Sequence, residues 1–221
     1  RHVFLLESVE GGEARGRYSI IGLEPDLLLR VTNGTAEINR RAALDADAYE
    51  ATDEKPLDVL RALIAESQVD VPEGLPTSSA GLYGYLGYEM VRQMEYLPNA
   101  NPDDLDMPDA LLMRPSLLAI FDTVKDELYL TAPVYYRKDV PADQAYELAM
   151  ERIDAAVARL SAGMPPSPAD ADLGTIEVCS NTTPERYEQM VDKARDYIVA
   201  GDIFQVVLSQ RFEAAFALPA T

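Results

Sequence analysis

Tryptophan is absent from this sequence of 221 residues, and cysteine and histidine occur once each, as Cys179 and His2. A single cysteine excludes an intrachain disulfide and a multi-cysteine metal site, and it is consistent with a reducing compartment. A single histidine at the very start gives little basis for a Ser-His-Asp or Cys-His catalytic arrangement. Because the chain has no tryptophan, the fluorescence of an added ligand can be read with little background.

Positive charge is also scarce, with 19 Lys and Arg against 38 Asp and Glu and a net charge of -19. Such a chain repels phosphate backbones and anionic lipids, so we expect no nucleic-acid partner and no membrane partner. No apolar run approaches the roughly 20 residues that span a bilayer. Glu7 and Glu10 interrupt the apolar start of the chain too early for a signal peptide. Together these features favour a cytoplasmic protein.

Apolar residues make up 48% of the chain, which is enough for one large or two small cores. Strand-like runs alternate with a few helical ones, so we predict an α+β fold in which antiparallel sheets are flanked by helices. Residues 163–175 contain three prolines and two glycines among small and acidic residues, which is typical of a linker. The predicted domains are therefore residues 1–162, this linker, and residues 176–221.

Local signals place several elements. Asn33-Gly34 tolerates the positive φ angles of a type I′ turn, so residues 27–32 and 35–39 are predicted to form a hairpin. Apolar residues recur with helical spacing in three segments: residues 57–64, 146–160 and 184–200. Thr183 and Gly201 are typical of the start and the end of the last of these helices.

Several further segments are predicted to be strands, and one is predicted to be a loop. Residues 17–21 are predicted to form a strand that ends at Gly22 and Pro25, and residues 45–55 a polar loop. Residues 110–124 and 127–134 are predicted to pair across a turn. The apolar run 203–212 is predicted to be a strand without neighbours of its own, and we expect it to pair with another chain or to be poorly ordered.

Three groups of residues, in order along the chain, carry a resemblance to known enzymes. They are Leu5-Leu6-Glu7-Ser8 with Gly16-Arg17-Tyr18-Ser19-Ile20-Ile21-Gly22; Gly81-Leu82-Tyr83-Gly84-Tyr85-Leu86-Gly87-Tyr88; and Asn181-Thr182-Thr183-Pro184 leading into residues 201–212. Together they resemble the anthranilate synthase component I family of chorismate-utilising enzymes. Members of that family start upstream of Arg1 and continue far beyond Thr221, so we expect a fragment that is truncated at both ends and inactive alone.

The resemblance implies a lyase of tryptophan biosynthesis. Enzymes of this family convert chorismate and ammonia to anthranilate and pyruvate, and a glutamine amidotransferase subunit supplies the ammonia. They require magnesium, and tryptophan inhibits them at a site away from chorismate. The magnesium ligands and most chorismate contacts belong to the C-terminal part of the family fold, so no metal ligand is assigned in this chain.

The same resemblance implies that Glu7, Ser8, Tyr18 and Ser19 contribute to the inhibitor site. The chemistry agrees, because a carboxylate such as Glu7 can pair with the ammonium of an amino acid and hydroxyl groups can hold its carboxylate. The residues alone leave another interpretation open, in which Glu7 is solvated at a strand end and Ser8 begins a turn. The other wall of the site lies in the C-terminal part of the family fold.

Gln205 is the candidate for an active-site-lining residue. Related enzymes that add water carry a lysine at this position, and that lysine is the base that activates the water. An amide cannot take a proton near pH 7, whereas neutral ammonia already has a nucleophilic lone pair, so Gln205 favours amine addition. An isolated glutamine in an apolar strand could equally face solvent.

Two alternatives to anthranilate synthase remain open. The aminating subunit of aminodeoxychorismate synthase, a folate-pathway enzyme, resembles this chain in its N-terminal motifs but has Asn in place of Val207 and Ala in place of Ser209. A stand-alone amino-acid-binding domain is the alternative that is not an enzyme.

Overall fold

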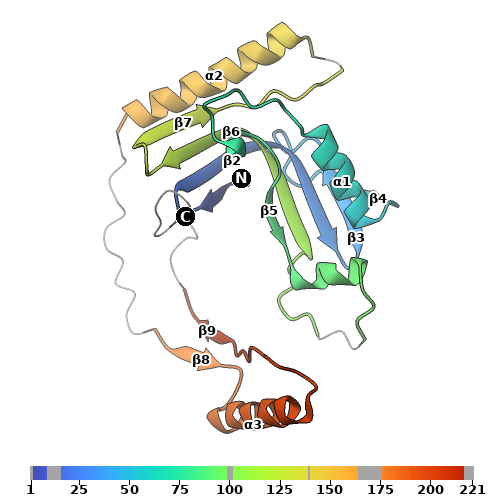
Figure 1. Ribbon diagram of the computed structural model, residues 1–221. Coiled ribbons are helices and arrows are strands. Elements are labelled where there is room, and N and C mark those ends of the chain that lie inside the picture. Colours follow the sequence, from blue (N-terminus) through green and yellow to red (C-terminus); the bar gives the residue numbers. More distant parts are fainter. Residues whose placement is uncertain (1, 9–15, 99–101, 139, 164–175, 217–221) are drawn as a thin grey trace. The chain divides into compact units, whose positions relative to one another are not determined.

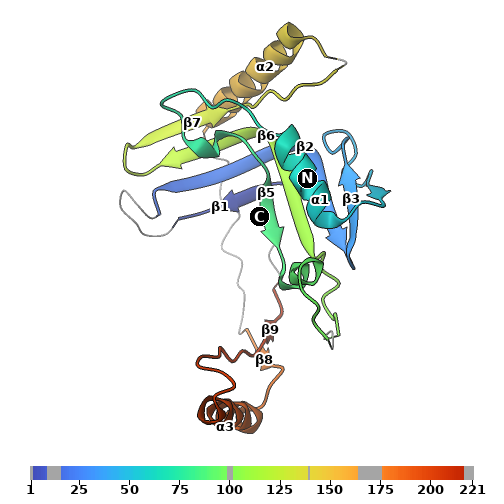
Figure 2. The same ribbon diagram turned by 45° about the vertical axis from the view of Figure 1, so that its right-hand side comes forward.

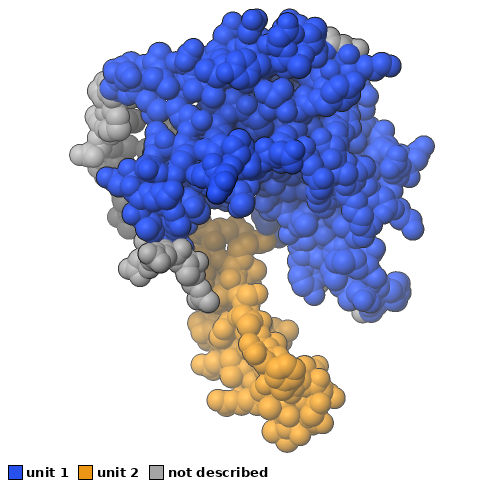
Figure 3. All heavy atoms as spheres, turned by 45° about the horizontal axis from the view of Figure 1, so that its top comes forward, with its two compact units in different colours: residues 1–163 blue, residues 164–221 orange. Residues whose placement is uncertain are grey.

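The computed structural model describes residues 2–8, 16–98, 102–138, 140–163 and 176–216. The chain divides into two compact units, residues 1–163 and 164–221, which Figure 3 shows in separate colours. Each unit is described by itself below. Except for Gly163, the predicted linker lies outside the described residues.

The described part of unit 1 is a seven-stranded sheet with two α-helices and two 3-10 helices (Figure 1). The strands are β1 (Phe4–Leu6), β2 (Tyr18–Thr32), β3 (Thr35–Asn39), β4 (Glu50–Thr52), β5 (Tyr83–Leu86), β6 (Ala110–Asp122) and β7 (Glu127–Thr131). The helices are α1 (Pro56–Glu66), η1 (Thr77–Ser79), η2 (Tyr88–Gln93) and α2 (Ala142–Ser161). The strand β4 corrects the prediction that residues 45–55 form only a loop.

The long antiparallel pair β2·β6 is the axis of this sheet, and its neighbours change along its length. At one end β1 pairs with β2 and β7 pairs with β6; at the other end β3 pairs with β2 and β5 pairs with β6. All pairings are antiparallel, as predicted. Figures 1 and 2 show the two long strands curving between these ends, with α1 beside β3 and α2 beside β7.

The prediction that a strand ends at Gly22 and Pro25 is wrong, because β2 continues through both residues. Pro25 lies opposite Pro115 of β6, where the register shifts between Pro25 and Leu27. Neither proline has an N–H, so neither adds a backbone donor to the β2·β6 pairing at this point. The extra residue of this bulge, Asp26, lets the strand bend instead of stopping.

Two clusters of buried residues hold unit 1 together. The larger cluster lies between the sheet and α1 and consists of Leu27, Leu29, Val31, Ala36, Val59, Leu63, Met90, Ala110 and Leu112. The smaller cluster is formed by Ile20, Leu118 and Ile120, with Phe4, Tyr18, Tyr83 and Tyr129 packed against it. Strands β2 and β6 contribute to both clusters, which follow the alternation of buried and less buried residues along β2.

The predictions of the Asn33-Gly34 turn and of two helices in unit 1 are confirmed. Asn33 and Gly34 both have positive φ angles, 50° and 75°, between β2 and β3, whose paired ends are Thr32 and Thr35. Both predicted helices of unit 1 are present as α1 and α2. Of the residues in α2, Ala149 alone is buried, so this helix buries little of its surface against the sheet.

The described part of unit 2 consists of the two-stranded pair β8 (Val178–Ser180) and β9 (Phe212–Ala214) and the helix α3 (Pro184–Ala200). The Thr183 side chain accepts a hydrogen bond from the backbone N–H of Arg186, and Gly201 ends the helix with a left-handed φ of 82°, as predicted.

The predicted strand 203–212 is wrong. Residues 203–211 form no regular secondary structure, and only the short segment from Phe212 pairs, with β8. Phe204 is 94% exposed and Val207 is 82% exposed. The apolar run has the composition of a strand, but a strand needs a neighbour whose backbone it can bond, and the described residues offer one only from Phe212 onward.

Candidate functional site

The ends of β1 and β2 bring three of the predicted inhibitor-site residues together. The backbone N–H of Ser8 donates to Ser19 Oγ at 3.1 Å, and the Ser8 hydroxyl donates to the carbonyl oxygen of Tyr18 at 2.7 Å. Both bonds follow from the antiparallel pairing of β1 with the start of β2, in which Leu6 lies opposite Ile20. Ser8 therefore has both its backbone and its side chain fixed by two consecutive residues of β2.

The side chains at this strand end can still form further hydrogen bonds. The Ser19 oxygen accepts from Ser8 and keeps its own proton for another acceptor, while Ser8 Oγ keeps its lone pairs. Glu7 is exposed and forms no hydrogen bond or ion pair with the described residues. A carboxylate, a hydroxyl donor and a hydroxyl acceptor at one strand end can bind the ammonium and carboxylate groups of an amino acid.

A buried ion pair that the sequence did not indicate supports this strand end. Arg17 Nε and Nη2 donate to Asp122 Oδ1 and Oδ2 at 2.9 and 2.6 Å, and the Asp122 side chain is 1% exposed. The backbone N–H groups of Val124 and Lys125 also donate to Asp122. The hydrogen bond from Arg17 and these backbone donors lower the pKa of Asp122 to about 2, against the effect of burial.

The glycine of the Arg17–Gly22 motif has a steric reason. The Phe4 ring lies over Gly22, its partner in the β1·β2 pair, so closely that a Cβ at position 22 would overlap the ring. The same ring stacks on Tyr83 of β5, with centroids 4.7 Å apart and ring planes 21° apart. These contacts hold β1 against the sheet three residues before Glu7, the first residue of the predicted site.

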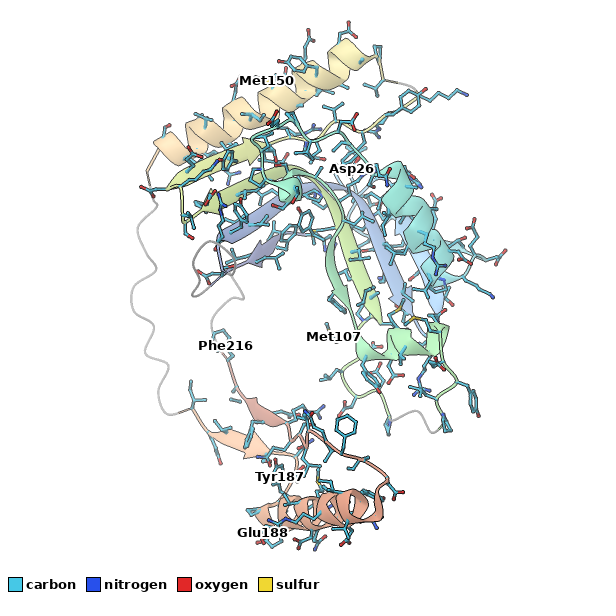
Figure 4. The ribbon with its side chains drawn as sticks, viewed as in Figure 1. Asp26, Met107, Met150, Tyr187, Glu188 and Phe216 are labelled. Atoms are coloured by element: carbon cyan, nitrogen blue, oxygen red, sulfur yellow. The ribbon has the colours of Figure 1, made fainter. Side chains whose placement is uncertain are left out.

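A second ion pair lies at the bend of β2·β6. Arg114 is 5% exposed and donates to both carboxylate oxygens of Asp26 at 2.8 and 2.7 Å (Asp26 is labelled in Figure 4). It also donates to Glu66 and Ser67 at the end of α1, and its guanidinium lies 4.2 Å from the ring centroid of Tyr135. This network joins the bulge to α1. Its sequence signal was a single arginine within an apolar strand, which reveals a buried charge but not its partners.

Gln205, the predicted active-site residue, belongs to unit 2 and lies in the irregular segment before β9. Its side chain is exposed and forms no hydrogen bond with the described residues. A cavity of about 230 Å³ separates α3 from this segment, and its lining includes the neighbours Ile203 and Val206. The larger cavity, about 420 Å³ at the end of α1, is lined by residues 64–71 and 77–82 and by none of the predicted site residues.

Magnesium was expected from the family resemblance. Within the described ranges, no three His, Cys, Asp or Glu side chains lie where they could hold a metal ion. The carboxylates of the ion-pair networks described above, Asp122, Asp26 and Glu66, are all paired with arginines. These residues do not fit a metal site, and no reaction step is assigned to magnesium. Among the same residues, no helix has the length and hydropathy to cross a membrane.

Comparison with known proteins agrees with this picture. The family profile of chorismate binding enzymes matches residues 3–221. The chain is 48% identical over 220 residues to anthranilate synthase component 1 of Cereibacter sphaeroides and 37% identical over 225 residues to that of Synechocystis. The alignments cover 98% and 96% of this chain and 43% of each relative, so the chain spans less than half the length of these proteins.

A solved structure supports the same relationship. The crystal structure of anthranilate synthase component I from Streptococcus pneumoniae matches with a TM-score of 0.73 and 25% identity over 96% of this chain and 44% of that one. The predicted mixed α+β fold, with antiparallel sheets and helices as in anthranilate synthase component I, is thereby confirmed. The family match over residues 3–221 confirms the resemblance as well: the chain belongs to the family of chorismate binding enzymes.

Proposed function

We propose that this chain belongs to component I of an anthranilate synthase. This enzyme is a lyase that converts chorismate and ammonia to anthranilate, pyruvate and water. The observation that carries the proposal is the match over almost the whole chain to relatives named anthranilate synthase component 1. Component 1 implies a second component, and we propose that it is a glutamine amidotransferase that supplies the ammonia. The single Cys179, which excludes an intrachain disulfide, is consistent with a cytoplasmic enzyme.

Within this function, Glu7, Ser8, Tyr18 and Ser19 are proposed to bind tryptophan as a feedback inhibitor. The bonds from Ser8 to Tyr18 and Ser19 support this proposal, because they hold polar groups of fixed direction at an accessible strand end. Gln205 is proposed to line the chorismate site, and its exposed side chain supports that role because it is not used to hold unit 2 together. Magnesium belongs to the proposal as a requirement of the complete enzyme.

The test is to express the complete open reading frame that encodes this chain and to supply chorismate, magnesium and ammonium. Anthranilate fluorescence at a rate of about 1 per second or more, with one pyruvate per anthranilate, is the expected result. Formation of an aminated chorismate without pyruvate would assign the protein to the aminodeoxychorismate synthases instead. Tryptophan binding without any turnover would favour an amino-acid-binding domain.

The same assay examines Gln205. Replacing it with alanine should reduce the rate about tenfold or more without changing the melting temperature, because an exposed side chain that lines a substrate site contributes to turnover but not to stability. Equal rates in the wild type and in Gln205→Ala would remove Gln205 from the active site.

A further inference from the structure

The strongest unassigned feature of unit 1 is the way in which Arg17 is held. Its side chain makes two hydrogen bonds to Asp122, and its carbonyl oxygen accepts from both the backbone N–H and the hydroxyl of Thr123, at 3.0 and 2.9 Å. Residue 17 is thus fixed from its backbone and from its side chain by two consecutive residues at the end of β6. Such a double anchor leaves little freedom to the residues that follow it.

The residues that follow are the ones that hold Ser8. Tyr18 supplies the carbonyl oxygen for the Ser8 hydroxyl, and Ser19 supplies the oxygen for the Ser8 N–H. The Arg17 guanidinium also lies 5.0 Å from the ring centroid of Tyr18. A continuous series of contacts therefore runs from the buried carboxylate of Asp122 through Arg17 to the hydroxyl of Ser8.

We infer that the Arg17–Asp122 pair orients the groups that bind the amino-acid inhibitor. The pair sets the directions of the Ser8 and Ser19 hydroxyl groups without touching the ligand. The inference rests on the proposed function, because it assigns the regulation of that enzyme. An inhibitor held by few polar groups depends strongly on their directions, since hydrogen bonds weaken steeply away from linear geometry. Arg17 and Asp122 are positioning residues, and they act through Ser8.

The chain offers a matched control. The Arg114–Asp26 pair also joins β2 to β6 through two parallel hydrogen bonds to a carboxylate, but it lies at the bulge and leads to α1. Asp26→Asn should therefore destabilise the fold much as Asp122→Asn does, while it leaves the contacts of Ser8 intact. Loss of stability and loss of positioning can be separated in this way.

The experiment measures anthranilate formation by the complete protein against tryptophan concentration, with each variant normalised to its own uninhibited rate. Asp122→Asn keeps the size of the side chain but loses its charge. Arg17→Lys keeps the charge but cannot bind both carboxylate oxygens in parallel. Each should raise the half-inhibitory tryptophan concentration about fivefold or more, whereas Asp26→Asn should leave it within about twofold of wild type.

A double variant tests whether the pair acts through Ser8. In a Ser8→Ala background, adding Asp122→Asn should shift half-inhibition by less than about twofold, because the contact through which it acts is already lost. Unchanged inhibition in both single variants, or an equal shift in Asp26→Asn, would overturn the inference and leave the proposed activity standing. If the wild type forms no anthranilate, the proposed function fails and the inference fails with it.

Discussion

Ser8 shows how much one side chain at a strand end can determine. Its hydroxyl donates to Tyr18 and its backbone N–H to Ser19, so the polar groups of the proposed inhibitor site are connected even without a ligand. Removing the hydroxyl breaks one of these bonds and deletes an acceptor for the ligand, while the backbone bond remains. A hydroxyl at such a position is expected to affect binding more than folding.

Replacing Ser8 with alanine in the complete protein should therefore relieve tryptophan inhibition. One lost hydrogen bond costs about 0.5–1.5 kcal/mol, which corresponds to a rise in the half-inhibitory concentration of roughly two- to tenfold. The measurement is an inhibition curve with kcat and KM for chorismate determined in parallel. Inhibition that persists unchanged in Ser8→Ala and in Glu7→Ala would return this segment to a solvated strand end followed by a turn.

At the residue scale, prediction from the sequence succeeded for local chemistry and failed for partners. The Asn33-Gly34 turn needs only positive φ angles at two adjacent residues, so its signal is contained in the dipeptide. The carboxylate of Asp122 pairs with a guanidinium 105 positions earlier in the chain. No periodicity or spacing in a single sequence indicates that two such distant positions are in contact. The Arg17–Asp122 pair that supports Ser8 could therefore be identified only from the structure.

Among the elements, α3 is the one whose limits were predicted most closely. Thr183 accepts from the N–H of Arg186, and Gly201 takes a left-handed φ of 82° that lets Asp202 donate to the carbonyl of Tyr197. Both signals lie within the helix and its flanks. The segment 203–212 was predicted wrongly because an apolar run indicates that side chains could be buried in a strand, but not whether a neighbouring strand is there.

The end of α3 permits a clean measurement of backbone strain. A Cβ at position 201 meets no atom within 4 Å, so Gly201→Ala adds no clash and changes only the cost of the left-handed φ. We expect about 1 kcal/mol of local destabilisation, which is a roughly fivefold faster hydrogen exchange of the amides in α3. Gly201→Asn should show a smaller effect, because asparagine tolerates this conformation. Equal exchange in all three proteins would contradict a strain-limited helix end.

The strand β2 shows the limit of reading elements one by one. Gly22 and Pro25 are strand-ending signals in isolation, yet the Phe4 ring above Gly22 requires a glycine there, and Pro25 lies within the strand pairing, opposite Pro115. Both reasons involve residues from other strands. Contacts between strands overrode the local strand-ending preference of these residues, since strand propensity depends on its surroundings.

For the whole molecule, the net charge of -19 sets two opposite responses to acid. Protonation of exposed carboxylates reduces self-repulsion and stabilises the fold. Protonation of Asp122, whose pKa is held at about 2 by Arg17 and by backbone donors, destabilises it. Because its folded pKa lies below the ordinary value near 3.9, the stabilisation by Asp122 is present above about pH 4 and is lost as the pH falls through about 2.

The two responses separate when wild type and Asp122→Asn are compared by urea unfolding across the pH range. Their difference in unfolding free energy should stay constant from pH 7 to about pH 5 and shrink progressively between about pH 4 and pH 2. Asp53→Asn, at an exposed position, is the control and should show no such narrowing. A difference that is independent of pH down to 2 would mean that Asp122 does not carry its charge in the fold.

The shared strands β2 and β6 have a consequence for how unit 1 comes apart. Each strand contributes side chains to both buried clusters, and the two strands pair with each other on both sides of the bulge, so they connect the two ends of the sheet. If one cluster unfolded, β2 and β6 would lose packing contacts, and the other cluster depends on the same two strands. Unit 1 is therefore expected to unfold as a single cooperative transition. Probes at Tyr83, which packs against the smaller cluster, and at Tyr49, whose ring centroid lies 4.0 Å from the guanidinium of Arg30 in β2, should report the same midpoint.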